Sequence, residues 1–280
     1  MGLVNSLIYY FILAIARISA LLPWPIISLI AKVISWIWYY LIPFRKSLII
    51  ENISLAFPEK SAEEVRRITR ANLTHYCLLV LESLQLGFLS QKELLEKIAA
   101  FQNPGAGLKA YKEGKGLLIL TAHIGNFEWM PAVAPLYGFN FVHIIAKPLR
   151  NPVAERLIQS TRGRWVKLIT SKDGFHEAFR LLKNNEIIGV MLDQHRGGNG
   201  AVWIDFFNRP AGTMKYLAVL AERTGAPVVP VKNVRLPDGK LLIEFDNPIP
   251  FERVGSVQEN IRHNTELYTK RIEEWIRKCP

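Results

Sequence analysis

Two apolar runs open the chain, and each is long enough to be a membrane segment. As a helix of about 1.5 Å per residue, the run from Asn5 to Leu22 spans roughly 27 Å, close to the hydrocarbon thickness of a bilayer. Arg17 interrupts it near its C-terminal end, where a long side chain can reach the headgroups. The second run, Pro25 to Phe44, is rich in Trp and Tyr and suits an interface. We therefore predict a membrane anchor and interfacial helix over residues 1–44.

We expect this anchor to be retained rather than cleaved. Residues 1–6 carry no charged side chain, and residues 21–25 do not resemble a signal-peptide cleavage site. Lys32, Arg45 and Lys46 lie in or just after the second run, so the positive-inside rule predicts that the following domain faces the cytoplasm. The alternative is an apolar helical hairpin that packs on the protein itself.

Beyond the apolar start, the periodicity is first helical and then strand-like. From Ser61 to a stop at Gly87, apolar residues recur at helical spacing, and Ser61 and Glu64 form a capping-box pattern. Beyond Gly114, short runs rich in branched residues alternate with helical stretches such as residues 174–185. The runs are GLLILTA (116–122), FVHIIA (141–146), VKLIT (166–170) and IIGVMLDQ (187–194).

These patterns predict an α/β fold. Continuously apolar runs are typical of strands buried on both faces, hence of a mixed, mostly parallel central sheet flanked by helices. Residues 228–236 and 240–245 indicate a hairpin around a turn at residues 237–239, and a last helix is predicted from about Ser256 to Lys278. We predict two domains, the anchor over residues 1–44 and a catalytic domain over residues 45–280.

Composition indicates only that the partners of the chain are negatively charged. The chain has 35 Lys and Arg against 24 Asp and Glu, a net charge of +11. Nucleic acid, an anionic membrane, an acidic protein and a phosphorylated substrate all fit that charge. The only cysteines, Cys77 and Cys279, are too few for a disulfide framework and lack metal-ligand spacing, which favours a reducing compartment.

The strongest chemical signal follows the run that ends at Thr121. Five residues apart on one helix, His123 and Glu128 would sit about 140° from each other, so His123 should precede the helix. Asn126 would then cap it and Glu128 would lie in its first turn, facing the histidine. In such a pair the imidazole removes a proton from an attacking hydroxyl, while the carboxylate fixes its tautomer. Helix N-terminal amides nearby could stabilise an oxyanion.

This H-x4-E spacing resembles the dyad of the glycerolipid acyltransferase superfamily, and HIGNFE (123–128) resembles the late acyltransferases of lipid A biosynthesis in particular. Further matches follow in order and cover most of the chain. They are residues 45–59 with Asn52 and Phe57-Pro58-Glu59, the pair Asp193-Gln194, residues 206–213 and residues 224–230. In one departure, such proteins usually continue past the last helix with a Pro-Glu-Gln-Trp type segment, whereas this chain stops at Pro280.

The resemblance implies a sheet of about seven strands in a catalytic domain tethered to the cytoplasmic side of a bacterial inner membrane. It also implies transfer of a fatty acyl group from acyl carrier protein to a hydroxyl of a Kdo-bearing lipid A precursor, forming an acyloxyacyl ester. The expected partners are this carrier protein, the anionic glycolipid and the membrane, with no nucleic acid. We expect no metal and no organic cofactor.

The predicted site has two tiers of residues. His123 and Glu128 are the predicted catalytic pair. Candidates for substrate binding or oxyanion stabilisation are Asn126, Arg162, Arg164, Asp193, Gln194 and Arg196. The resemblance favours an arginine at position 162 or 164 without deciding between them, and a solvated basic helix face is the alternative for each arginine. Asp193 is interpreted as an anchor for a basic residue or as a turn former at a strand end.

Three rival interpretations remain open. A zinc site of His123, His143 and His195 would lack the usual ligand spacing. A related transferase could act on another acceptor, such as a phosphatidylinositol mannoside or a lysophospholipid, because acceptor choice does not reside in these motifs. A non-catalytic peripheral membrane protein is the third, and the intact dyad argues against it. Phe206 and Phe207 are interpreted as core residues rather than as an acyl-chain lining.

Overall fold

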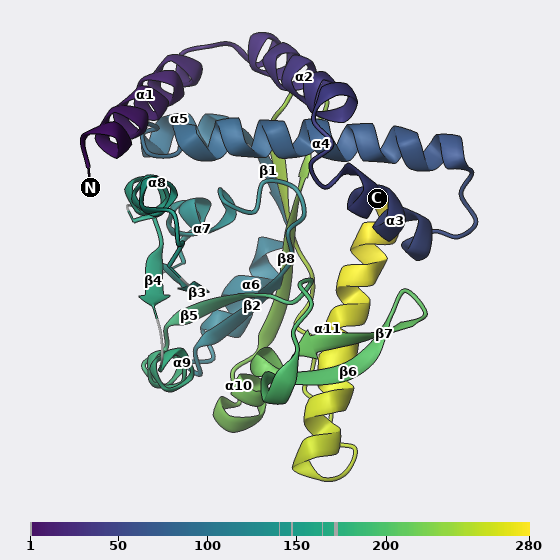
Figure 1. Ribbon diagram of the computed structural model, residues 1–280. Coiled ribbons are helices and arrows are strands. Elements are labelled where there is room, and N and C mark those ends of the chain that lie inside the picture. Colours follow the sequence, from purple (N-terminus) through teal and green to yellow (C-terminus); the bar gives the residue numbers. More distant parts are fainter. Residues whose placement is uncertain (1, 140, 147, 164, 171–172) are drawn as a thin grey trace. The chain divides into compact units, whose positions relative to one another are not determined.

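The chain folds into two compact units, residues 1–89 and residues 90–279, which we call the N-terminal unit and the sheet unit. The computed structural model describes residues 2–139, 141–146, 148–163, 165–170 and 173–280 (Figure 1). The compact units divide at a different place from the predicted boundary at residue 44. That boundary separates an expected anchor from an expected catalytic domain, and it stays a prediction.

The N-terminal unit consists of four helices. They are α1 (Leu3–Ala20), α2 (Trp24–Leu41), α3 (Lys46–Ala56) and α4 (Ala62–Gln85). The first three each contact α4. The two predicted apolar runs form α1 and α2, both long and apolar enough to cross a membrane. The predicted capping box is confirmed, because Ser61 accepts a hydrogen bond from the amide of Glu64 while the Glu64 carboxylate accepts one from the Ser61 amide.

Seven strands form the central sheet of the sheet unit, as predicted. They are β1 (Ile98–Gln102), β2 (Leu117–Thr121), β3 (Val142–Ala146), β4 (Lys167–Thr170), β5 (Ile187–Met191), β8 (Val228–Arg235) and β9 (Leu241–Phe245). Their order is β1-β9-β8-β2-β5-β3-β4. Neighbours run parallel except for the β8–β9 hairpin, whose antiparallel pairing and turn at residues 237–239 match the prediction. The α/β, mostly parallel fold class is confirmed.

One face of this sheet is a solid core. Alternate residues of the central strands, such as Leu118, Leu120, Ile188 and Val190, point into it. Three helices supply the opposite wall, namely α9 (Gly174–Lys183), α10 (Tyr216–Thr224) and α11 (Val257–Lys278). The last of these begins after the N-cap Ser256, close to the predicted start. Because successive strand residues point to opposite faces, the residues between these core positions face the other side of the sheet.

Several short elements complete the unit. They are α5 (Gln91–Glu96), α6 (Pro104–Tyr111), α7 (Met130–Val133), α8 (Pro152–Arg162), β6 (Ala201–Phe206), β7 (Arg209–Met214) and two 3-10 turns (Pro135–Tyr137 and Gly198–Gly200). The strands β6 and β7 form a separate two-stranded hairpin. Its turn places Phe207 and Asn208 at positive φ, as a two-residue hairpin turn requires. Phe207 is buried and lies beneath the Arg277 guanidinium.

Candidate active site

The register of two neighbouring strands brings the first site residues together. Within the parallel β2–β5 pair, Thr121 lies opposite Met191. His123 and Asp193 each follow two residues later, so both leave the same edge of the sheet side by side. The carboxyl edge of a parallel sheet is where α/β proteins commonly place their ligands.

Asp193 holds His123 at two points. The His123 amide donates to Oδ2 of Asp193 at 3.0 Å, and the imidazole Nδ1 lies 2.9 Å from Oδ1 and 3.1 Å from Oδ2. An ionised carboxylate can only accept, so this contact assigns the ring proton to Nδ1 and leaves a lone pair on Nε2. The side chains of His123 and Asp193 are 24% and 16% exposed, so the pair stays reachable from solvent.

The free nitrogen of the imidazole points to a polar, accessible position. Nε2 of His123 lies 3.3 Å from the side-chain nitrogen of Gln194, which can donate to its lone pair. Gln194 is exposed, while on another side of the ring Phe127 packs edge-on at 4.7 Å between ring centroids. The imidazole therefore has one nitrogen fixed by a carboxylate and the other available to an incoming group.

Glu128 makes a different contact from the one predicted. Arg162, the last residue of α8, binds the Glu128 carboxylate with two nitrogens: Nε donates at 2.6 Å and Nη2 donates to the other oxygen. Both side chains are largely buried. Within the described residues, the carboxylate at Nδ1 of His123 is thus Asp193, and the expectation that Glu128 faces the histidine is wrong. Glu128 instead neutralises and orients a guanidinium by a forked ion pair.

The start of the following helix also differs from the prediction. The helix α7 begins only at Met130, so Asn126 is not its cap and Glu128 is not in its first turn. Residues 125–129 form bends and turns instead, in which Trp129 donates to the Asn126 carbonyl. A four-residue helix lacks the aligned dipoles of a long one, so the suggested oxyanion site at its N-terminus has little support.

A buried asparagine supports this turn from β8. Asn233 is fully buried, and its Oδ1 accepts from the amide of Asn126 at 2.7 Å. Gly125 adopts φ +60° against it, and a Cβ there would come within 2.2 Å of Asn233 Oδ1. Sequence reasoning missed Asn233. The available signal was an uncharged polar residue within the strand-like run 228–236, where Lys232 and Arg235 are the other polar residues, since an amide buried in a strand requires a partner.

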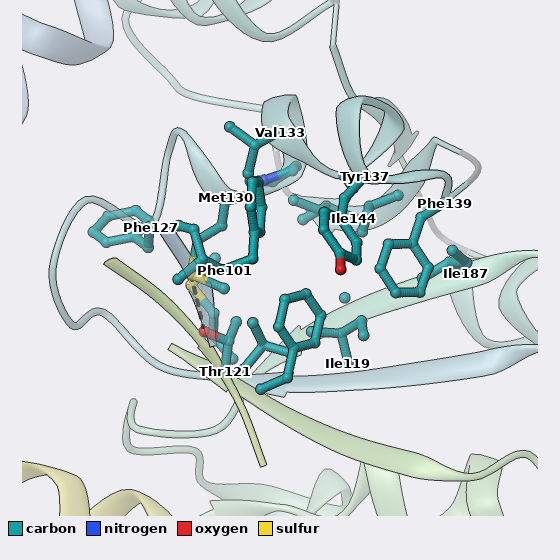
Figure 2. A pocket seen from close by; sticks show the side chains of 18 residues that line it. Phe101, Ile119, Thr121, Phe127, Met130, Val133, Tyr137, Phe139, Ile144 and Ile187 are labelled. Carbon is teal, nitrogen blue, oxygen red and sulfur yellow. Dashed lines mark hydrogen bonds between the residues drawn. The ribbon is translucent and has the colours of Figure 1, made fainter. Parts of the chain in front are cut away.

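An apolar pocket occupies the second face of the sheet (Figure 2). Its floor consists of alternate strand residues, including Ile119 and Thr121 of β2 and Ile187, Gly189 and Met191 of β5. Its roof is the segment from Phe127 to Phe139. About 690 Å³ of empty space lies between these walls, counting the part open to solvent. Phe127 belongs both to the pocket wall and to the packing around His123, so one side chain links the pocket to the imidazole.

The remaining candidates fall into different places. Arg164 lies outside the described residues. Arg196 is exposed in the loop after Gln194, where its amide donates to the Gly212 carbonyl. The histidines of the rival zinc site are dispersed, since His143 contacts Glu186 and His195 packs near Trp203. In the described part of the chain, no three His, Cys, Asp or Glu side chains gather where they could share a metal ion.

Comparison with known proteins identifies the family of the chain. The chain is 23% identical over 223 residues to the lipid A biosynthesis lauroyltransferase of Escherichia coli strain K12, covering 78% of this chain and 71% of that protein. It also resembles the solved 1-acyl-sn-glycerophosphate acyltransferase of Thermotoga maritima, with a TM-score of 0.41, 17% identity, and 90% and 95% of the two chains covered. The family model for bacterial lipid A biosynthesis acyltransferases matches residues 3–280, nearly the whole chain, and the protein therefore belongs to that family.

Proposed function

We propose that this acyltransferase moves a fatty acyl group from acyl carrier protein to a hydroxyl of a Kdo-bearing lipid A precursor, with His123 as the general base. One observation carries the proposal. The imidazole has Nδ1 held by Asp193 and Nε2 beside the exposed Gln194, and its ring neighbour Phe127 lines an apolar pocket. A base beside a pocket for a hydrocarbon chain is the arrangement that acyl transfer to a hydroxyl needs.

The histidine and aspartate act together on the acceptor. The acceptor hydroxyl takes the place of the Gln194 amide at Nε2 and gives up its proton as its oxygen attacks the thioester carbonyl. Asp193 stabilises the imidazolium that forms and keeps the productive tautomer. The imidazolium then returns the proton to the leaving thiolate as the carbon–sulfur bond breaks. The products are an ester and a free thiol, with charge and protons balanced.

Gln194 and Arg162 have supporting roles in this mechanism. The Gln194 amide, displaced from Nε2, is free to donate to the oxyanion of the tetrahedral intermediate. Arg162 is held by Glu128, so its guanidinium is oriented. An oriented guanidinium with one donor edge left is suited to a phosphate of the acceptor.

The pocket supports the identity of the group transferred. Its walls are almost entirely hydrocarbon, and ligand pockets of this kind hold apolar groups while a few polar groups fix their orientation. Along β5, from Met191 to Ile187, the floor extends about 13 Å at roughly 3.3 Å per residue. A medium-length fatty acyl chain fits this depth, and the lauroyltransferase relative is named for such a chain.

The donor and the acceptor are the parts of the proposal that rest on family membership and charge. A phosphatidylinositol mannoside or a lysophospholipid is the alternative acceptor. A transfer assay with labelled acyl donor across these three acceptors tests the choice, and we expect product with the Kdo-bearing precursor. Preference for either alternative acceptor would overturn the acceptor assignment.

The role of His123 has its own test. Replacing His123 by alanine should lower turnover by roughly a hundredfold to ten-thousandfold, the usual contribution of a positioned general base. His176→Ala on α9 is the matched control and should keep full activity. If a folded His123→Ala enzyme retained the parent turnover, the base would have to be another group.

A further inference from the structure

The helix α2 has two opposite apolar faces with different partners. Ile27, Ala31, Ser35 and Tyr39 recur every four residues along one face and are buried. The opposite face carries large exposed side chains: Ile26, Leu29, Val33, Trp36, Ile37 and Tyr40. At 100° per residue the centres of these two stripes lie about 180° apart. One face is therefore occupied by protein, and the other is free over the full length of the helix.

The occupied face of α2 lies along α4. Ile27 and Ala31 share a cluster with Cys77 and Leu78, which fixes one end of α2 on the C-terminal half of α4. In the middle, the hydroxyls of Ser35 and Thr74 hydrogen-bond at 2.7 Å. These contacts progress in opposite directions along the two helices, so α2 lies antiparallel on α4.

At the C-terminal end of α2, an aromatic side chain lies close to two cationic groups. The Tyr39 ring lies 5.7 Å from the Arg70 guanidinium and 4.8 Å from the Lys46 ammonium. The pairing with α4 therefore extends from the first turn of α2 to its last, with a polar bond in the middle and cations at one end.

The helix α1 repeats this arrangement. Tyr9, Ala16 and Ser19 are buried, and Gln85 of α4 donates to the Ser19 carbonyl at 3.1 Å. The large side chains on the other side are exposed. They are Leu3, Val4, Leu7, Tyr10, Phe11, Ile15 and Ile18. Both apolar helices thus pack a narrow face with small or polar residues, such as Ala31, Ser35 and Ser19, toward α4, and most of their large apolar residues lie outward.

Their common support, α4, cannot accompany them into hydrocarbon. Of its 24 residues, six are ionic: Glu63, Glu64, Arg66, Arg67, Arg70 and Glu82. Charged side chains inside a bilayer are strongly disfavoured unless they reach the headgroups. A spanning α2 would have to leave α4 or carry Arg70 and Thr74 inside with it. An α2 that lies flat keeps every contact of the N-terminal unit and places only its free face in lipid.

The charges of this segment match an anionic lipid surface. The chain has no Asp or Glu before Glu51, whereas Arg17, Lys32, Arg45 and Lys46 precede it. Basic residues flanking an apolar face, with Trp and Tyr on that face, are the composition of helices that lie in the membrane interface. The partner of the free face is therefore a phospholipid leaflet with anionic headgroups.

We propose that α1 and α2 lie in the plane of one leaflet and do not cross the membrane, so that the whole N-terminal unit stays on one side. This replaces the spanning helix predicted from the length of the first apolar run. The inference does not depend on the acyl donor or the acceptor, because acyl transfer in detergent can be measured separately from topology.

Sided labelling tests the topology in the full-length protein. Single cysteines replace Gly2, Leu21 or Ser61, all of them exposed, in a Cys279→Ser background. Gly2 is the N-cap residue that precedes α1. Cys77 remains, since it is buried and burial raises the pKa of its thiol; the parent without an added cysteine gives the blank. A membrane-impermeant maleimide is applied to spheroplasts or to inverted membrane vesicles, with detergent-opened samples as the total.

The expected result is labelling of all three positions from the same side only. A spanning α1 would expose Gly2→Cys and Ser61→Cys on opposite sides, and a spanning α1–α2 hairpin would expose Leu21→Cys opposite to both others. Either pattern would overturn the in-plane arrangement.

A second measurement asks whether lipid covers the free face. A fluorophore on Leu29→Cys should be quenched by brominated phospholipid in vesicles that contain anionic lipid, whereas the same fluorophore on Ser61→Cys should not. An unquenched probe at position 29 in membrane-bound protein would mean that a second copy or another protein covers this face, and the proposal would fail.

Discussion

At the scale of single residues, the two acidic side chains near His123 have separate tasks. Asp193 accepts from the imidazole, whereas Glu128 accepts from the Arg162 guanidinium. A carboxylate at Nδ1 controls the tautomer and the charge of the base, while a carboxylate on a neighbouring arginine controls only the position of a cation. The consequences of removing them should therefore differ in kind.

Replacing Asp193 by asparagine tests the first task. An asparagine amide can donate to Nδ1, which favours a proton on Nε2, the tautomer that cannot accept from a hydroxyl. We expect turnover to fall about a hundredfold or more with the fold intact. We also expect activity to recover partly at higher pH, where hydroxide can replace the base.

Turnover over a range of pH is the measurement for this variant. Asp173→Asn, an exposed residue before α9, should leave the profile unchanged. An Asp193→Asn enzyme with the parent pH profile would show that the Asp193 contact has no role in catalysis.

Glu128 and Arg162 should behave as a coupled pair. Glu128→Gln or Arg162→Met alone leaves a partly buried charge without its partner, whereas the double variant removes both charges. We expect the double variant to lose less free energy of unfolding than the two single variants lose in sum. The difference, which is the coupling energy of the pair, should be roughly 0.5–3 kcal/mol. Denaturant unfolding of the four proteins measures it. Additive losses would mean that the ion pair contributes no interaction energy.

The sequence located these residues but could not assign the partners among them. The motifs predict His123, Glu128, Asp193 and an arginine at position 162 or 164, and the structure pairs His123 with Asp193 and Glu128 with Arg162. The assignment of Glu128 to His123 assumed a helix beginning near Asn126. The helix begins at Met130 because Gly125 and Asn126 are held by Asn233, more than a hundred residues away along the chain. A contact between residues so far apart in the chain cannot be predicted from the spacing of neighbouring residues.

At the scale of elements, the pocket depends on which residue of β5 faces its interior. Gly189 lies on the pocket floor between Met191 and Ile187, and a Cβ there would come within 3.1 Å of Val142 Cγ1. A larger side chain at this position would project into the middle of the pocket, about 7 Å below Met191 at 3.3 Å per residue. Substitution should therefore shorten the space available to an acyl chain.

We predict that Gly189→Val shifts donor preference to shorter acyl chains. Rates with long-chain donors should fall at least tenfold relative to rates with donors several carbons shorter, because the pocket cannot relax fully around an added isopropyl group. Competition between donors of different chain length measures the preference. Ile188→Val, on the opposite face of β5, is the control and should change stability without changing preference. An unchanged preference in Gly189→Val would place the acyl chain elsewhere.

Periodicity predicted the long and strongly apolar elements and missed the irregular ones. The strands β2, β3, β4, β5, β8 and β9 and the helices α4, α9 and α11 lie close to their expected ranges. The first strand, β1, has a mixed burial pattern and gave no signal. The β6–β7 hairpin was recognised only as a motif, because Arg209, Pro210 and Gly212 are unusual in a strand.

At the scale of the whole molecule, the net charge of +11 should influence which acyl donor the enzyme prefers. A carrier protein spreads acidic side chains over a broad surface, whereas coenzyme A presents its phosphates to a small site. The Debye length falls from about 30 Å at 0.01 M to about 8 Å at physiological ionic strength, so the long-range part of docking is screened. We predict that the rate at limiting acyl carrier protein falls severalfold over this range.

The comparison between donors provides the control. With one acceptor and the same salt range, the rate with acyl coenzyme A should decline less steeply. Preference for coenzyme A at every salt concentration, without a steeper decline for the carrier protein, would remove the donor assignment and leave the chemistry of His123 untouched.

The order of the sheet also sets the order in which the molecule can be assembled during synthesis. The central strand β2 pairs with β8, which leaves the ribosome about a hundred residues later. At roughly 5–20 residues per second, one edge of β2 stays unpaired for on the order of five to twenty seconds. Asn233 arrives on that same late strand, so the turn after His123 cannot settle before then. The N-terminal unit, complete by residue 89, can fold first. If it binds a leaflet as proposed, the chain reaches the membrane before its site is assembled.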